Sequence, residues 1–164
     1  MKTKRLQNII FSALIAAVYA SLTLVNPFSF GQVQLRVSEV LTILATVTPT
    51  AIPGLTVGCL IANFASFMPL DCVFGTMATL LAALTAWILR NLRIKGYPVL
   101  SAMMPVFFNA IIIGAQLCLY SGNVTLKSFI LLAFSVGAGE FIVCLAALLF
   151  FPAFNRIYNK LLNR

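Results

Sequence analysis

The residues of this chain that could do chemistry have carboxylate, guanidinium and amide side chains, and these groups commonly bind small molecules. The stretch RVSEVLT, residues 36–42, holds an arginine and a glutamate three positions apart in a chain that is 62% hydrophobic. Carboxylates accept hydrogen bonds, guanidinium groups donate them, and amides do both, so together such groups can bind a polar ligand. The candidate substrate-binding residues are Arg36, Glu39, Asn63, Asp71, Asn109 and Glu140.

Composition excludes several catalytic classes. The chain has no histidine, which removes H-E-x-x-H metalloproteases, Ser–His dyads and most zinc chemistry. Its single aspartate excludes an aspartyl dyad, and no G-x-x-x-x-G-K-[ST] phosphate loop occurs. We therefore predict no catalytic residue, no metal ligand and no cofactor. A membrane enzyme using Glu39 and Glu140 as acid and base is the minor alternative.

The elements that position these residues are predicted to be membrane helices. Such high apolar content with only 9% charged residues indicates an integral membrane protein, here a single all-α domain over residues 1–164. Cutting the apolar runs at Pro, Gly, Asn and charge gives six spans. They lie near Leu6–Val25, Val37–Val47, Ile52–Phe67, Cys72–Leu89, Val99–Tyr120 and Leu126–Phe151. The second and third are short, because Pro49 and Pro53 interrupt helical hydrogen bonding, and they are expected to form a tilted or partly re-entrant hairpin.

The distribution of the basic residues predicts the orientation of the chain in the membrane. Six spans leave both termini on one side, together with nine of the eleven basic residues. These nine are Lys2, Lys4, Arg5, Arg90, Arg93, Lys95, Arg156, Lys160 and Arg164. Only Arg36 and Lys127 fall on the other side. The positive-inside rule then predicts cytoplasmic termini, and it explains the net charge of +8 without a nucleic-acid partner.

This topology places all three acids in the outer or central membrane. Arg36 and Glu39 are expected at the outer end of the second span, with Asp71 starting the fourth span on that same side. Asn63 falls in the outer part of the third span, while Asn109 and Glu140 lie nearer the middle of the last two. A buried charge in a membrane helix costs roughly 2.5–3.5 kcal/mol, so such groups face a cavity or a partner.

Structural roles compete with binding at each position. Arg36 and Glu39 can form an interfacial ion pair, Asp71 can cap a helix, and the two asparagines can hydrogen-bond between helices. A helix dipole disfavours a cation at Arg36, which suggests that Glu39, Asp71 or a ligand holds it. A purely structural role suits Glu140 least. The convergence of these groups on one half of the membrane favours a binding site.

Small residues in the first span form two possible helix-packing faces. Ala13 and Ala17 are four residues apart, and Ala16 and Ala20 form an adjoining row. Either face permits close helix approach, to a partner protein or inside the bundle, and internal packing is slightly favoured. The G-x-x-x-G at 54–58 is assigned to internal packing.

Five motifs together resemble the QueT family, the queuosine-precursor transporters, which are substrate-binding S components of energy-coupling factor (ECF) transporters. In order along nearly the whole chain they are LRVSEVLTIL, AIPGLTVGCLIAN, LDCVFGTMATLLAA, PVFFNAIIIGAQL and VGAGEFIVC. The resemblance implies a six-helix S component in the bacterial cell membrane that captures a 7-deazaguanine derivative outside. It also implies partners, one transmembrane coupling protein and two ATPase subunits, docked through an A-x-x-x-A motif at Ala13 and Ala17, or at Ala16 and Ala20.

The chemistry of that ligand suits the candidate residues. A deazaguanine presents N1–H and a 2-amino group as parallel donors, which Glu140 or Glu39 can accept. A cationic 7-aminomethyl group would be drawn to a remaining carboxylate, and Asn63 and Asn109 suit O6 and a ring N–H. Arg36 is expected to orient Glu39 or to close the outer mouth. An S component for another vitamin-like solute and a self-contained secondary carrier are the alternatives.

Overall fold

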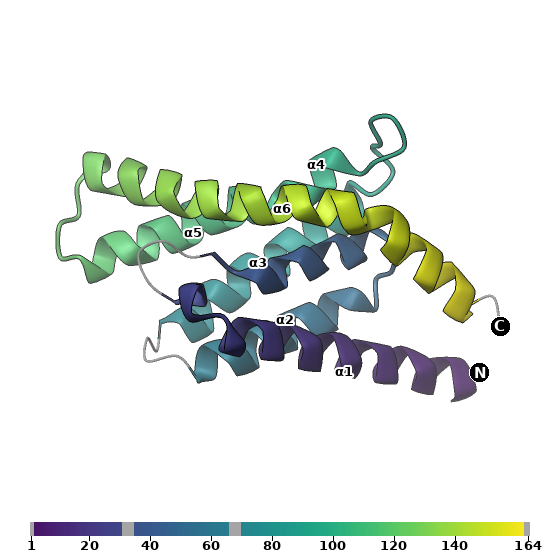
Figure 1. The fold of residues 1–164 in the computed structure, drawn as a ribbon. Coiled ribbons are helices and arrows are strands. Elements are labelled where there is room, and N and C mark those ends of the chain that lie inside the picture. Colours follow the sequence, from purple (N-terminus) through teal and green to yellow (C-terminus); the bar gives the residue numbers. More distant parts are fainter. Residues whose placement is uncertain (1, 31–34, 66–69, 163–164) are drawn as a thin grey trace.

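The chain folds into helices joined by short connections (Figure 1). The computed structural model describes residues 2–30, 35–65 and 70–162. Within these ranges no strand occurs, only one isolated bridge between Ile94 and Tyr97, so the all-α prediction is confirmed. The elements are α1 (Lys2–Val25), η1 (Pro27–Ser29), η2 (Val37–Thr46), α2 (Ala51–Phe64), α3 (Asp71–Ile88), α4 (Val99–Ala102), α5 (Met104–Tyr120) and α6 (Leu126–Leu162).

Four stretches are long and apolar enough to cross a membrane, namely Lys4–Val25, Asp71–Ile88, Val99–Tyr120 and Leu126–Lys160. The elements η2 and α2 are shorter, as predicted. The predicted end of the third span at Phe67 lies outside the described residues. The last helix is longer than predicted, because it passes through Pro152 and continues to Leu162. Proline removes only one backbone N–H, so neighbouring turns can carry a long helix past it.

The connection between η2 and α2 differs from the prediction at one proline. Pro49 lies in the turn, but Pro53 is the third residue of α2. The first N–H groups of a helix have no partner within the helix, so a proline there costs no hydrogen bond. Pro53 therefore lies in the first turn of α2 and does not interrupt it.

The element η2 lies at the centre of the bundle. The helices pack in sequence: α1 on α2, α2 on α3, α3 on α5 and α5 on α6. The element η2 contacts α1, α2, α3, α4 and α6. It is a 3-10 helix of 10 residues, where such helices seldom exceed three or four. Three residues per turn place Glu39 and Thr42 on the same row. The RVSEVLT stretch therefore carries its polar groups into the middle of the molecule.

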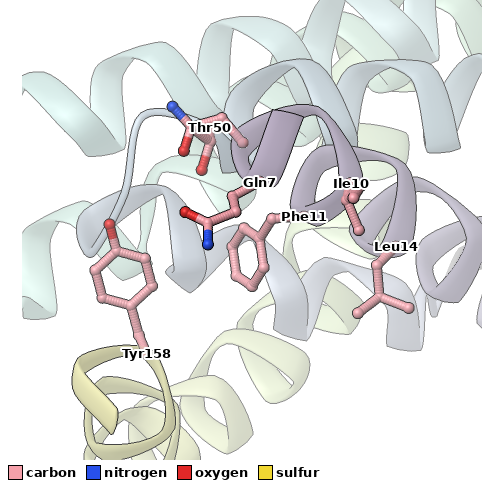
Figure 2. Close-up of a pocket in the computed structure, with 7 residues that line it drawn as sticks. Gln7, Ile10, Phe11, Leu14, Thr50 and Tyr158 are labelled. Carbon is pink, nitrogen blue, oxygen red and sulfur yellow. The ribbon is translucent and has the colours of Figure 1, made fainter. Parts of the chain in front are cut away.

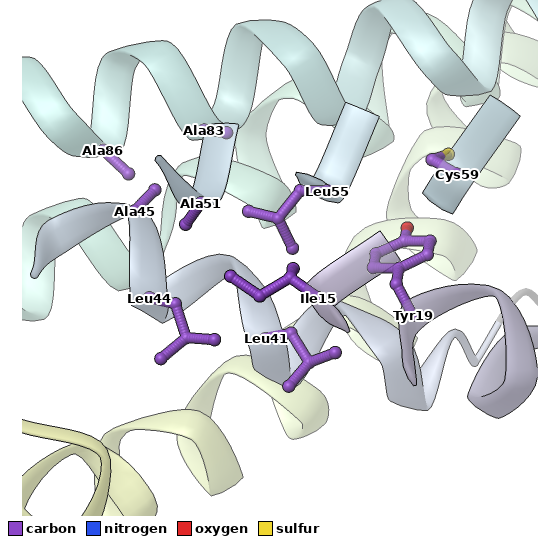
Figure 3. Close-up of a cluster of buried hydrophobic side chains, with 10 residues drawn as sticks. All are labelled: Ile15, Tyr19, Leu41, Leu44, Ala45, Ala51, Leu55, Cys59, Ala83 and Ala86. Carbon is purple, nitrogen blue, oxygen red and sulfur yellow. The ribbon is translucent and has the colours of Figure 1, made fainter. Parts of the chain in front are cut away.

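Apolar side chains hold η2 between its neighbours. Figure 3 shows a cluster in which Ile15, Leu41 and Leu55 from three elements point toward one another. Ala83 and Ala86 of α3 line its edge, and alanine lets helix backbones approach closely. Close packing of this kind fixes η2 against α1 and α2.

The outer surface is apolar and the polar side chains are inside. Large apolar residues face outward along α1 and α6, with Leu14 at 58%, Phe134 at 76% and Leu149 at 80% exposed. Arg36 and Glu39 are each only 1% exposed. This is the reverse of a protein in water and suits a hydrocarbon solvent. The chain is a multi-pass membrane protein.

Both termini lie at the same end of the bundle, as does the loop between α3 and α4 (Figure 1). Arg93 and Lys95 of that loop line one pocket together with Arg156 of α6. The start of α6, with Lys127, is at the opposite end (Figure 1). The predicted gathering of cations at one end is seen for these residues, while Arg164 lies outside the described residues.

Candidate binding site

The six predicted site residues are all buried and lie on or beside five elements. Their exposed fractions are 1% for Arg36, Glu39, Asn109 and Glu140, and 0% for Asn63 and Asp71. Arg36 precedes η2, Glu39 is on η2, and Asp71 opens α3. A membrane interior offers no water to these groups, so their contacts decide what each can do.

Glu140 of α6 and Asn109 of α5 form one pair. The Asn109 amide Nδ2 donates to Glu140 Oε1 at 3.0 Å. The remaining oxygens, Glu140 Oε2 and Asn109 Oδ1, are buried and have no hydrogen-bond partner among the described residues. This interhelical bond is the structural alternative to binding that the sequence left open for Asn109, and it leaves two acceptors without a donor in the described part of the chain. An unsatisfied buried acceptor costs about 1–3 kcal/mol, which a ligand donor would recover.

Glu39 has a different environment, because hydroxyl groups satisfy both of its oxygens. Tyr19 of α1 and Thr79 of α3 donate to Oε1, the latter at 3.0 Å. Thr42 donates to Oε2 at 2.6 Å. Three hydroxyl donors from three elements fix this carboxylate in place. Glu39 therefore stabilises the junction of α1, η2 and α3, and it is less available to a ligand than Glu140.

Arg36 pairs with Asp71. A guanidinium nitrogen, Nη2, lies 3.6 Å from Asp71 Oδ2, the one ion pair in the described part of the chain. The alternative of an ion pair between Arg36 and Glu39 is therefore wrong. The helix-cap alternative for Asp71 is also wrong, since Leu70 is the N-cap of α3 and makes no side-chain cap bond. The Asp71 side chain accepts instead from Gln116 of α5.

Asn63 and Gly75 complete this second group. Asn63 Nδ2 donates to the backbone oxygen of Asp71 at 2.8 Å and links α2 to α3, which is the structural alternative that the sequence left open for this residue. A Cβ added at Gly75 would lie 2.5 Å from Asn63 Nδ2 and 3.1 Å from Arg36 Nη1. The missing side chain lets the amide and the guanidinium pack directly on the α3 backbone. The glycine is therefore part of what positions Arg36.

The groups act on one another electrostatically. The charges of Glu39 and Arg36 are close enough to interact with the carboxyl group of Glu140. Counted as ionised, three carboxylates face one guanidinium in the chain interior. Arg36 Nη1 and Nη2, Asp71 Oδ2 and Gln116 Oε1 also lack a hydrogen-bond partner in residues 2–30, 35–65 and 70–162. A polar ligand could pair with these unsatisfied buried donors and acceptors.

Sequence reasoning missed Gln116 and the hydroxyl donors. Gln116 is 0% exposed and lies seven residues after Asn109, two helical turns along the same face. That spacing could have identified Gln116 from the sequence alone. Tyr19 and Thr79 carried no comparable signal, because single hydroxyl groups are frequent in membrane helices and only their contacts with Glu39 distinguish them.

The two alanine rows of α1 differ in their exposure. Ala16 and Ala20 are buried, at 6% and 7% exposure, while Ala13 and Ala17 are exposed. A Cβ added at Gly58 of α2 would lie 2.7 Å from the backbone oxygen of Ala16, so α1 and α2 are in backbone contact there. The internal role assigned to G-x-x-x-G is confirmed. Only the Ala13 and Ala17 row remains open on the surface.

A surface pocket of about 210 Å³ lies against the first half of α1 (Figure 2). Phe11 and Leu14 of α1 line it, with Thr50 before α2 and Tyr158 of α6. The Phe11 and Tyr158 rings are 6.0 Å apart. None of the buried polar residues lines this pocket, so it is separate from the candidate binding site.

Apolar helices around a buried polar cluster define a polytopic membrane protein, and polar residues inside the membrane are typical of transporters. The chain belongs to the QueT transporter family, whose family model matches residues 9–156. The predicted resemblance is thus confirmed, and the family is one of transporters, not enzymes. The "Queuosine precursor transporter QueT" of Lactococcus lactis subsp. cremoris is 37% identical over 83 residues, 49% of each chain. The match thus spans about half of that relative's length. No solved structure matches the chain significantly.

Proposed function

We propose that this protein is the substrate-capture subunit, or S component, of an ECF-type importer for a queuosine precursor. The observation that carries the proposal is the Glu140–Asn109 pair, which presents two unpaired buried acceptors, Oε2 and Oδ1. Family membership and the name of the Lactococcus relative support the substrate class. Residues 1–164 would act as a single six-helix domain.

A 7-deazaguanine base has the complementary groups. Its N1–H and 2-amino donors would both point to Glu140, while Asn109 Oδ1 accepts a ring N–H. The net negative charge of the buried acids, three carboxylates and one guanidinium when counted as ionised, suits a cationic 7-aminomethyl substituent near a carboxylate. Arg36 would donate to O6 or close the outer mouth, and Asn63 would hold the Asp71 segment in position.

The importer would require a transmembrane coupling protein and two ATPase subunits, because the chain carries no phosphate loop of its own. We assign docking of the coupling protein to Ala13 and Ala17, the exposed row on α1. Ala16 and Ala20 are buried, Ala16 against Gly58 of α2, and are not available for it. The basic end with both termini would face the cytoplasm of a bacterial plasma membrane.

Calorimetry on the purified chain tests the substrate. We expect tight binding of 7-aminomethyl-7-deazaguanine in neutral detergent without any partner, and much weaker binding of guanine. The 7-cyano base tests the contribution of the positive charge. An absence of heat with all deazapurines would contradict the substrate assignment. Mass spectrometry of the co-purifying solute would then identify an S component for another vitamin-like compound.

A matched pair of variants tests the docking row. Ala13→Leu with Ala17→Leu adds bulk to the open face, so substrate binding should persist while co-purification with the coupling protein is lost. Ala16→Leu with Ala20→Leu adds the same bulk against α2 and should instead lower thermal stability. Uptake by proteoliposomes containing this chain alone would show a self-contained carrier and contradict the ECF assignment.

A further inference from the structure

A cleft of about 500 Å³ opens at the end of the bundle that holds both termini. We call it the basic cleft. Its polar lining comes from the loop after α3 and from the last turns of α6. The lining residues that matter here are Arg93, Lys95, Tyr97, Asn155, Arg156 and Asn159. None of the candidate binding-site residues lines the cleft, so it is separate from the buried binding site.

The loop side of the cleft is a tight two-residue turn. Ile94 and Tyr97 exchange backbone hydrogen bonds at 2.9 and 3.0 Å across Lys95 and Gly96. Both central residues have positive φ, 50° at Lys95 and 85° at Gly96, as a type I′ turn requires. Asn or Gly is usual at the first position, and a lysine there adopts a sparsely populated conformation. The turn holds the Lys95 cation at the mouth of the cleft.

Two ring contacts fix this turn against α6. The Tyr97 ring centroid lies 6.2 Å from that of Phe151, and the Arg93 guanidinium lies 5.5 Å from the same Phe151 ring. Phe151 is only 4% exposed. The aromatic contact and the cation–π contact therefore set the spacing between Arg93 and Lys95 on the loop and Arg156 on the helix.

No acidic side chain neutralises these three cations. The chain has only three acids, and Glu39, Asp71 and Glu140 are all buried in the binding site, at 0–1% exposure. Three basic groups around one concave surface, without a carboxylate partner, create a positive potential that attracts an external anion. Two asparagine amides, Asn155 and Asn159, add neutral donors suited to phosphate oxygens and hydroxyl groups.

Exposed apolar residues stand next to lining residues of the basic cleft in the sequence. Exposed residues beside the lining in sequence include Ile94 at 60%, Phe150 at 55% and Ile157 at 55%. A free anion gains nothing from such neighbours, whereas the acyl chains of a lipid do. Basic pockets between helices at a membrane surface suit anionic lipid headgroups. We propose that the basic cleft binds the phosphate headgroup of an anionic glycerophospholipid.

Lipid titration of the purified full chain, followed by native mass spectrometry, tests this site. Phosphatidylglycerol should bind more tightly than phosphatidylcholine, and binding should weaken as salt rises. Replacing the three cations by glutamine (Arg93→Gln, Lys95→Gln, Arg156→Gln) should weaken phosphatidylglycerol binding at least tenfold, since each cation near an anionic headgroup contributes about a fivefold effect. Helical content, measured by circular dichroism, should not change.

A matched control removes the same charge outside the cleft, in Lys4→Gln, Arg5→Gln and Lys160→Gln together. This variant should keep the preference for phosphatidylglycerol, and an equal loss in both variants would overturn the site in favour of diffuse attraction. If the triple cleft variant does not fold, Lys95→Gln alone should still weaken binding about fivefold, because Lys95 is exposed.

Two further experiments distinguish a lipid headgroup from other sources of the anion. Inorganic phosphate at millimolar concentration should neither displace phosphatidylglycerol nor match its stabilising effect. Complete displacement would overturn the lipid assignment and indicate a site for a free phosphate compound. Loss of co-purifying coupling protein in the triple cleft variant, with lipid binding unchanged, would overturn it too and indicate an acidic protein surface.

Discussion

Replacing Glu140 by glutamine tests the binding site most directly. The change keeps the shape of the side chain and removes its charge. Glutamine can still accept from Asn109 Nδ2 through Oε1, which was the 3.0 Å contact in the native protein. The position of Oε2, unpaired and buried, would then hold an NH2 group. A donor would replace the acceptor that the N1–H and 2-amino groups of a deazaguanine require.

The expected magnitude follows from burial. Glu140 is 1% exposed, so water cannot replace the lost contact. A hydrogen bond to a charged group contributes about 1.5–3 kcal/mol. Since about 1.4 kcal/mol corresponds to tenfold in affinity, binding of 7-aminomethyl-7-deazaguanine should weaken by about 10- to 150-fold. Thermal stability should be equal or higher, because a neutral amide costs less to bury than a carboxylate.

Isothermal calorimetry and thermal unfolding of the same samples measure both effects. Lys127→Gln on the exposed first turn of α6 is the control, since it also removes a charge from that helix and should change neither quantity. Unchanged affinity in Glu140→Gln with an intact fold would refute the role of Glu140 in reading the base. Glu39 would then be the remaining carboxylate to test.

Three stability predictions follow from the contacts around the site, each measured by thermal unfolding in detergent. Tyr19→Phe removes one of three hydroxyl donors to Glu39 and should cost about 0.5–1.5 kcal/mol, up to twice that because the acceptor is charged. Gly75→Ala places a methyl group 2.5 Å from Asn63 Nδ2 and should cost about 1–3 kcal/mol. Gln116→Leu leaves a buried aspartate with one donor fewer and should cost about 1–3 kcal/mol.

The tyrosine and glycine variants each have a control of the same chemical type, and Gln116 has a second test variant. Tyr158→Phe, on the partly buried C-terminal part of α6, should have little effect. Gly137→Ala meets its nearest atom at 3.3 Å, so its cost should be smaller than at Gly75. For Gln116, Gln116→Glu is informative, because two adjacent carboxylates should destabilise more than leucine does. A Gly75→Ala protein as stable as the native one would contradict the packing of Arg36 on α3.

The sequence predicted that the protein belongs in a membrane, where its long helices lie, and that six polar side chains lie inside the helix bundle. These follow from local properties, since hydropathy and helix length are read within about 20 residues. The gathering of cations at one end also followed from counting spans. The 3-10 form of η2 and the continuation of α6 past Pro152 were not predictable in this way. Both depend on packing against neighbours that supply what local propensity lacks.

Only the tertiary structure decided how the polar groups are paired. Glu140 meets Asn109 across 31 positions of sequence, and Glu39 meets Thr79 across 40. The sequence left either glutamate as the possible base reader, with a purely structural role suiting Glu140 least. In the structure, hydroxyl donors satisfy both oxygens of Glu39, whereas Glu140 keeps one unpaired oxygen.

The alanine rows of α1 show the same division. Ala13 with Ala17 and Ala16 with Ala20 have identical spacing, so the sequence determined that α1 has two faces suited to close packing. Which face is covered depends on where α2 lies, and the contact at Gly58 places it over Ala16. Residue types are a property of the chain, whereas the availability of a surface or a lone pair depends on which distant segment packs against it.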